Sequence, residues 1–128
     1  MEIRPLEREK MVFENGAFGQ RLLPWAALNA PFEGAWVTVP AHGATGAHSH
    51  HEYEIFIAVN GEAVVESGGE RRAFKPGDIE FHQPGTEHRI LNDGAQDFEM
   101  YAIWWDSDMT AKFAARHEAQ ASDDQAQA

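Results

Sequence analysis

The chain has 128 residues, of which 43% are hydrophobic, including four tryptophans and eight phenylalanines. This length and composition indicate one folded domain with a real core, and they exclude intrinsic disorder and a second large domain. The formal net charge is −11, with only ten lysines and arginines and no basic stripe, which argues against binding to the phosphates of nucleic acids.

The absence of cysteine excludes disulfides, thiolate metal sites and cysteine nucleophiles, and it favours a reducing compartment. The first ten residues are highly charged and lack the apolar stretch of a signal peptide. No apolar run approaches the roughly 20 residues that a membrane-spanning helix needs. We therefore expect a cytoplasmic protein without a membrane partner.

Residues 1–34 are predicted to form an N-terminal arm with one or two edge strands, within Met11–Leu23. Ala35–Val39 reads as the next strand, and a glycine-containing loop follows at residues 40–46. Tyr53–Val59 is rich in β-branched and aromatic residues, which favour strands. Asn60-Gly61 then predicts a type I′ hairpin, because both residues tolerate positive φ.

Short strands and turn signals continue to residue 105. The predicted strands are Glu62–Ser67, Arg71–Phe74, Ile79–His82, His88–Leu91 and Asp97–Trp105. Turns fall between them at Ser67–Glu70, Lys75–Asp78, Pro84-Gly85 and Asn92–Gly94. Seven or eight antiparallel strands are enough for a small jelly roll or barrel over residues 35–106, so the fold class is all-β.

The last segment, residues 107–128, has a different pattern. Ser107 or Asp108 could cap a helix through Met109–Ala119, with Phe113 packing inward. The final eight residues are small and polar with nothing to bury, so we expect a frayed or disordered tail.

Two histidines and a carboxylate follow the loop at residues 40–46. His48, His50 and Glu54 are spaced i, i+2 and i+6, so on an extended strand their side chains would point the same way. Imidazole and carboxylate groups suit borderline divalent metals, and His88 could complete the site from another strand. Glu52 shares the parity of Glu54 and is a rival carboxylate.

Two motifs within residues 43–92 resemble the conserved motifs of the cupin superfamily. They are Gly43-(x)4-His48-x-His50-(x)3-Glu54-(x)6-Gly61 and Gly77-(x)5-Gln83-Pro84-Gly85-(x)2-His88-(x)3-Asn92. Gly43 is one residue closer to His48 than is usual, and Gln83 stands where the family generally has proline. The resemblance implies an antiparallel cupin β-barrel, or jelly roll, with a short C-terminal helix. It also favours Glu54 over Glu52 as the ligand.

We therefore expect one divalent metal ion per chain, bound by His48, His50, Glu54 and His88. Iron, zinc, manganese, nickel and cobalt all suit three imidazoles and a carboxylate. An octahedral metal would keep two positions for water or substrate.

Other residues are candidates for contact with a substrate. His82 occupies a strand position where an apolar residue would be ordinary, so it is a candidate proton carrier. Tyr101 is a second candidate catalytic residue. Phe56 continues the parity of Glu54 and is expected to face the barrel interior. Trp105 is a candidate substrate contact, since one of the tryptophans at 104 and 105 should face inward.

Cupins with this ligand set include dioxygenases, isomerases and lyases, so the resemblance implies an enzyme acting on a small polar metabolite. A second resemblance, over Pro31–Trp36 and Ile103–Asp106, is to zinc cupins that accompany methionyl-tRNA synthetase-like domains and form N–N bonds in hydrazine-type biosynthesis. A cupin that binds a small molecule without turnover is the third possibility. The resemblance to small cupins also implies a homodimer, because sandwiches with exposed edge strands gain by pairing them. Met11–Leu23 is the candidate contact.

Overall fold

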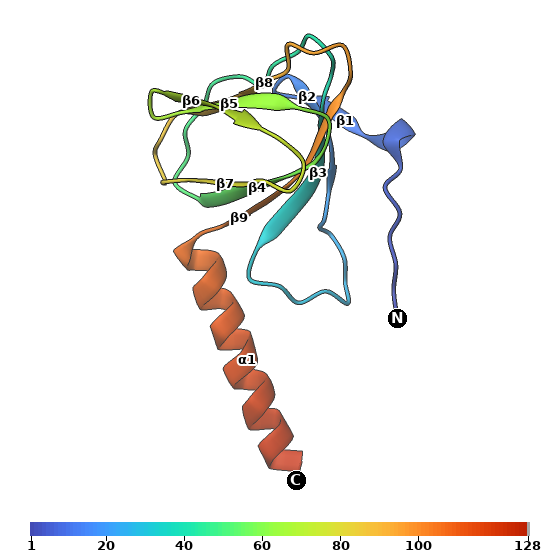
Figure 1. Ribbon diagram of the computed structural model, residues 1–128. Helices are drawn as coiled ribbons and strands as arrows, with labels where there is room; N and C mark the ends of the chain where they lie inside the picture. Colours follow the sequence, from blue (N-terminus) through green and yellow to red (C-terminus); the bar gives the residue numbers. More distant parts are fainter. Residues whose placement is uncertain (128) are drawn as a thin grey trace.

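The computed structural model describes residues 1–127, and the side chains of residues 1–118. In this part of the chain, nine strands form two antiparallel sheets (Figure 1). The strands are β1 Val12–Glu14, β2 Ala17–Arg21, β3 Glu33–Val39, β4 Tyr53–Asn60, β5 Ala63–Ser67, β6 Glu70–Phe74, β7 Ile79–His82, β8 His88–Leu91 and β9 Phe98–Trp105. A 3₁₀ helix, η1, spans Arg8–Lys10, and helix α1 spans Ser107–Gln127.

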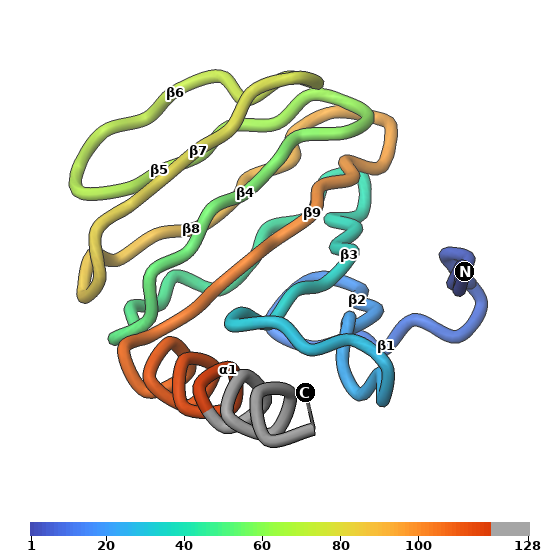
Figure 2. Tube along the Cα trace, turned by 90° about the horizontal axis from the view of Figure 1, so that it is seen from below, coloured from blue at the N-terminus to red at the C-terminus, as the bar shows by residue number. Residues whose placement is uncertain are grey.

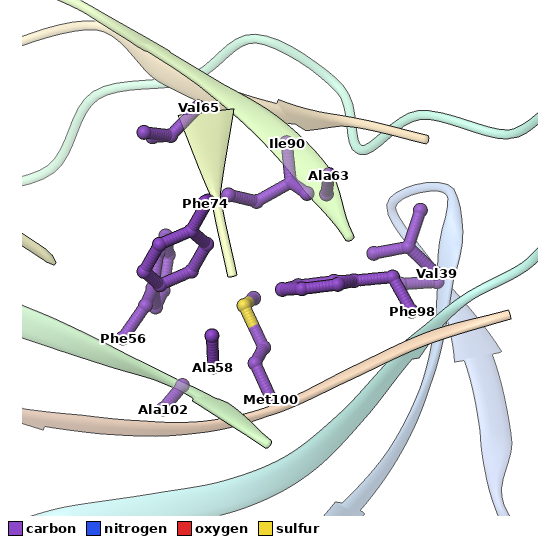
Figure 3. Close-up of a cluster of buried hydrophobic side chains, with 11 residues drawn as sticks. Val39, Phe56, Ala58, Ala63, Val65, Phe74, Ile90, Phe98, Met100 and Ala102 are labelled. Atoms are coloured by element: carbon purple, nitrogen blue, oxygen red, sulfur yellow. The ribbon is translucent and has the colours of Figure 1, made fainter. Parts of the chain in front are cut away.

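The larger sheet has the strand order β1-β2-β3-β9-β4-β7, and the smaller sheet has the order β6-β5-β8. Inward residues alternate with outward ones, as the buried Glu54, Phe56 and Ala58 on β4 illustrate. Large apolar side chains from both sheets, such as Phe74, Ile90 and Phe98, point toward one another in the core (Figure 3). The predicted all-β antiparallel barrel with a C-terminal helix is confirmed.

The turn predicted at Asn60-Gly61 is not a hairpin. Strand β4 pairs with β7 and β9, whereas β5 pairs with β6 and β8, so the chain crosses from one sheet to the other at this point. Gly61 is nevertheless required, because its φ is +83° and a Cβ would lie 2.6 Å from the carbonyl oxygen of Asp97. A hairpin with two positive φ values occurs instead at Asn15-Gly16, between β1 and β2.

Strands β1 and β2 both lie within the segment Met11–Leu23; β1 is an edge strand, whereas β2 pairs with β1 and with β3 and is interior. Seen from below, they lie at one side of the molecule, opposite β6 and β7 (Figure 2). Phe13 and Phe18 meet edge-to-face on these strands, with ring centroids 4.9 Å apart, and both remain exposed.

Helix α1 begins at Ser107 and runs away from the sheets (Figure 1). Its N-terminal cap is Asp106, whose carboxylate accepts the Met109 amide hydrogen at 2.8 Å, and not Ser107 or Asp108 as predicted. The helix continues to Gln127, through most of the segment predicted to be disordered; the last predicted tail residue, Ala128, lies outside the described residues. In residues 1–127, no helix is both long and apolar enough to cross a membrane.

Candidate metal centre

Three histidines and a glutamate meet where the two sheets face each other. Glu54 on β4 is directly opposite His82 on β7, His88 begins β8 in the other sheet, and His50 lies in the loop before β4. One ligand atom from each of these four side chains lies within 4.8 Å of the other three. We call these four residues the histidine–glutamate cluster.

The Glu54 carboxylate is the centre of this cluster. Its Oε1 lies 3.2 Å from Nε2 of His50, 3.4 Å from Nε2 of His82 and 3.3 Å from Nε2 of His88. The rings of His82 and His88 are stacked, with centroids 3.7 Å apart. Three imidazole nitrogens therefore converge on one carboxylate oxygen, which is the donor set of a divalent metal site.

Contacts at Nδ1 orient the histidine rings. The Nδ1 atoms of His50 and His88 donate to the carbonyl oxygens of Glu52 and Thr86, at 3.1 and 3.0 Å. His82 differs, because its Nδ1 donates to the carboxylate of Glu80 at 3.0 Å. Each bond leaves Nε2 directed at the cluster, as in metal sites where an outer partner fixes the ligating nitrogen.

The cluster also contains polar atoms without partners. Among the described side chains, Nε2 of His82 and Nε2 of His88 are buried and make no hydrogen bond. A buried polar atom left in this state costs about 1–3 kcal/mol, and a coordinated cation would remove that cost. The residues present therefore fit a divalent metal.

The charges of the cluster are strongly coupled. Burial alone would raise the pKa of Glu54, but the neighbouring His82 and His88, together with His50, lower it to about 2. Burial alone would lower the pKa of His82, but the carboxylates of Glu54 and Glu80 raise it to about 9. The site without a cation is thus held together by a buried charge pair.

The structure brings together three of the four predicted ligands, His50, Glu54 and His88. His48 lies beside them, with its ring centroid 4.4 Å from that of His88 and 5.5 Å from that of His50, but outside the group of four. Strand alternation does not apply to it, because β4 begins only at Tyr53. Nδ1 of His48 donates to the carbonyl oxygen of Gly46 at 2.9 Å and lies 3.2 Å from Nδ2 of Asn15.

Two predicted site residues, the candidate catalytic Tyr101 and the candidate substrate contact Trp105, lie on the outer face of the sheet. Because Glu54 pairs with Trp104, the alternation of β9 directs Tyr101 and Trp105 outward. Tyr101 packs edge-to-face on Trp36, and Trp105 stacks on Tyr53. Neither Tyr101 nor Trp105 therefore lines the cavity next to the cluster, and Trp104 is the inward tryptophan.

A cavity of about 230 Å³ adjoins the cluster and extends to β1 and β2. Phe56 lines it, as predicted, and so do Trp104, His48, Glu54 and His88. Glu80 was not among the predicted site residues, and Trp105 was chosen there in place of Trp104. Alternation could have placed Glu80 beside His82, since the two are separated by one residue on β7.

Comparison with known proteins agrees with this fold. The family model described as the cupin domain matches residues 35–104. The crystal structure of a cupin 2 conserved barrel domain protein from Salinispora arenicola is similar, with a TM-score of 0.87 and 48% identity, and it covers 91% of this chain and 98% of that one. The plu4264 protein from Photorhabdus luminescens has a TM-score of 0.87 and 40% identity, covering 91% of this chain and 97% of that one.

A curated relative is an oxalate-binding protein from Thermotoga maritima, which is 34% identical over 70 residues. The match covers 54% of this chain, and the chain spans 58% of the length of that relative.

Proposed function

Because the chain belongs to the cupin domain family, we propose that it binds one divalent metal ion in the histidine–glutamate cluster and acts on a small polar metabolite there. One observation supports this above all others: three Nε2 atoms converge on Oε1 of Glu54, and two of them are buried without a hydrogen-bond partner. Iron, zinc, manganese, nickel and cobalt all suit these ligands.

A bound metal would supply Lewis-acid polarisation of a ligand oxygen, or a site for oxygen chemistry. The chain's own residues hold and orient the groups around it. Glu54 provides the negative charge, and the carbonyl and carboxylate partners at Nδ1 keep each imidazole in one orientation. Phe56 and Trp104 line the cavity beside the cluster with apolar surface, which limits water at the polar end.

Two histidines compete for the remaining ligand position. His82 belongs to the cluster, whereas His48 is the ligand that the sequence motif implies. Titration with Co(II), followed by its absorption spectrum, separates them in the variants His48→Ala and His82→Ala. Loss of an outer partner typically weakens metal binding about 10–100-fold. Loss of the true ligand should weaken it by more than that.

Glu80→Gln provides a matched control for His82. If His82 is a ligand, this variant should weaken metal binding about 10–100-fold, since the carboxylate orients the ring. If His82 is instead a proton carrier, both His82→Ala and Glu80→Gln should retain about one metal per chain, and His82→Ala should lower turnover by roughly a hundredfold.

The alternatives differ in metal and in turnover. A non-catalytic small-molecule-binding protein is supported by the oxalate-binding relative, and it would bind oxalate with metal present but consume none. A cupin that forms N–N bonds would contain zinc. Metal content of the purified protein, followed by oxygen uptake and product analysis, therefore distinguishes the three possibilities.

We also propose a homodimer. Several exposed apolar side chains lie on the edge strands β1 and β7 and on β2 beside β1, and unpaired edges favour association: Val12, Phe13, Phe18, Ile79 and Phe81. Light scattering at micromolar concentration should give twice the mass of 14.3 kDa. A monomer would refute this proposal and leave the metal site unaffected.

A further inference from the structure

The cavity has two chemically different ends. One end is formed by Glu54 and His88 of the histidine–glutamate cluster. The other end lies under β1 and β2, where Glu14 and Arg21 line it. Among the described residues that line this cavity, Arg21 is the only lysine or arginine. In a chain of net charge −11, a cation at this position is an exception that needs an explanation.

Strand pairing shows what lies between the two ends. Arg21 on β2 is opposite Ala35 on β3, Ala35 is opposite Ala102 on β9, and Ala102 is opposite Phe56 on β4. Three strand spacings of about 4.8 Å place the Arg21 backbone roughly 14 Å from β4. Ala35 and Ala102 carry only small inward side chains along this line, and Trp104, two residues after Ala102 and opposite Glu54, borders it, so the register leaves a slot between Arg21 and Phe56 that passes beside Glu54.

The slot is lined with apolar surface. Val37 and Met100 continue its floor on β3 and β9, and Trp104 and Phe56 line it nearer the cluster. Apolar walls bind hydrocarbon, and the few convergent polar groups at the two ends would fix its orientation.

Arg21 is available for a ligand. Its side chain is 57% exposed, and its guanidinium lies 3.3 Å from the carboxylate of Glu14 and 5.8 Å from the ring centroid of Trp104. An exposed ion pair of this kind contributes about 0–1 kcal/mol, so an incoming anion can displace Glu14 at little cost. The planar guanidinium also matches the geometry of a carboxylate.

We propose that Arg21 recognises the anionic tail of an elongated ligand whose polar head binds the metal and whose apolar body lies over Ala35 and Ala102. This inference rests on the proposed function, because it assumes a metal at the other end. The ligand class is thus a carboxylate with a second anionic group at the far end of a hydrocarbon chain or ring. Arg21 would set specificity and would not take part in the reaction itself.

The test uses the full-length, metal-loaded protein and calorimetric titration with straight-chain dicarboxylates from oxalate to adipate, each paired with the monocarboxylate of equal length. Adipate should bind roughly tenfold or more tightly than hexanoate, because a charged hydrogen bond is added. Arg21→Gln should abolish that advantage. Oxalate is too short to reach Arg21, so its affinity should not change in this variant.

Further variants give effects that a structural role for Arg21 would not produce. Glu14→Gln removes the competing carboxylate and should strengthen adipate binding about two- to threefold. Ala102→Leu should fill the slot and weaken adipate binding while sparing metal content and oxalate binding. Arg71→Gln is the matched control, since the exposed Arg71 on β6 forms an ion pair with Glu66 on β5 and does not line the cavity.

The outcomes distinguish this inference from the proposed function. Absence of metal in the wild-type protein would overturn both. Normal metal content with equal affinities for adipate and hexanoate would overturn the role of Arg21 alone. Tighter binding of 6-aminohexanoate than of adipate, lost in Glu14→Gln, would also overturn it by assigning the recognition to Glu14.

Discussion

The two ends of the barrel are built from the same strands but differ in how their buried groups are satisfied. At one end of β4 and β9, the inward residues Ala58, Met100 and Phe98 belong to the apolar core cluster (Figure 3). At the other end, the inward residues are Glu54 and Trp104, and Glu54 is surrounded by histidines. Alternation directs side chains inward at both ends, so it is the residue type that makes one end a core and the other a site.

The difference has an energetic consequence. Apolar groups at the core end gain free energy simply by leaving water. The histidine–glutamate cluster instead buries charges and leaves two Nε2 atoms without hydrogen bonds. The stability of the core end should therefore be independent of metal, whereas the cluster should be stabilised by it.

The largest effect is expected at the core end. Phe98 is fully buried, and Phe98→Ala should lower the free energy of unfolding by about 3–5 kcal/mol, because it removes apolar burial and leaves a cavity. Urea denaturation should show the same loss with and without a chelator. A loss that depends on metal would show that the two ends are not energetically separate.

A metal should act on the other end of the barrel. With free metal at 100 times its dissociation constant, the free energy of unfolding should rise by about 2.7 kcal/mol. The variant Phe98→Ala should show the same rise with metal, because the substitution lies at the core end. If Phe98→Ala does not fold, Val39→Ala serves as the core variant instead. His88→Ala should lose the increment, since it removes a proposed ligand. Equal stabilisation of wild type and His88→Ala would place the metal elsewhere.

Without metal, the cluster should make stability depend on pH. The pKa of His82 is raised from 6.5 to about 9, so its contribution is complete below pH 6.5 and is lost as pH rises through 9. The pKa of Glu54 is lowered from 4.5 to about 2, so its contribution is complete above pH 4.5 and is lost as pH falls toward 2. Stability from this pair should be greatest between pH 4.5 and 6.5.

Chelator-treated protein, unfolded in urea across this range, tests the pH dependence. His82→Gln should remove the decline above pH 6.5, because glutamine does not titrate. A wild-type profile that is flat from pH 6.5 to 10 would contradict the charge pair.

The smallest effect is expected on the outer face of β9. Tyr101→Phe removes a hydroxyl group that points away from the cluster and the cavity, so stability should change by no more than about 0.5 kcal/mol. Metal content and oxalate binding should not change. A loss of metal in this variant would show that the outer face communicates with the site.

The success of sequence reasoning depended on whether a contact was local. The extended strands and the residues His50, Glu54 and His88 could be predicted, because alternation and motif spacing are properties of short segments. Membership of His82 in the cluster depends on the pairing of β4 with β7, which sequence alone did not reveal. The prediction of a hairpin at Asn60-Gly61 was wrong for the same reason, because β4 pairs with β7 and β9, which lie far along the chain.

The tryptophans on β9 show most simply what sequence alone could not predict. Alternation requires that Trp104 and Trp105 face opposite sides, but only the register with β4 determines which one faces inward. The position of Arg21 at the far end of the cavity likewise depends on three successive strand pairings.

The most direct test of the central claim is the metal content of the purified, reconstituted protein, measured by inductively coupled plasma mass spectrometry. The wild-type protein should contain about one divalent ion per chain, and the double variant His50→Ala, Glu54→Ala should contain almost none, because too few ligands remain to hold it. Arg71→Gln, carried through the same procedure, should match the wild type. A wild-type value near zero, or an unchanged value in the double variant, would contradict the account.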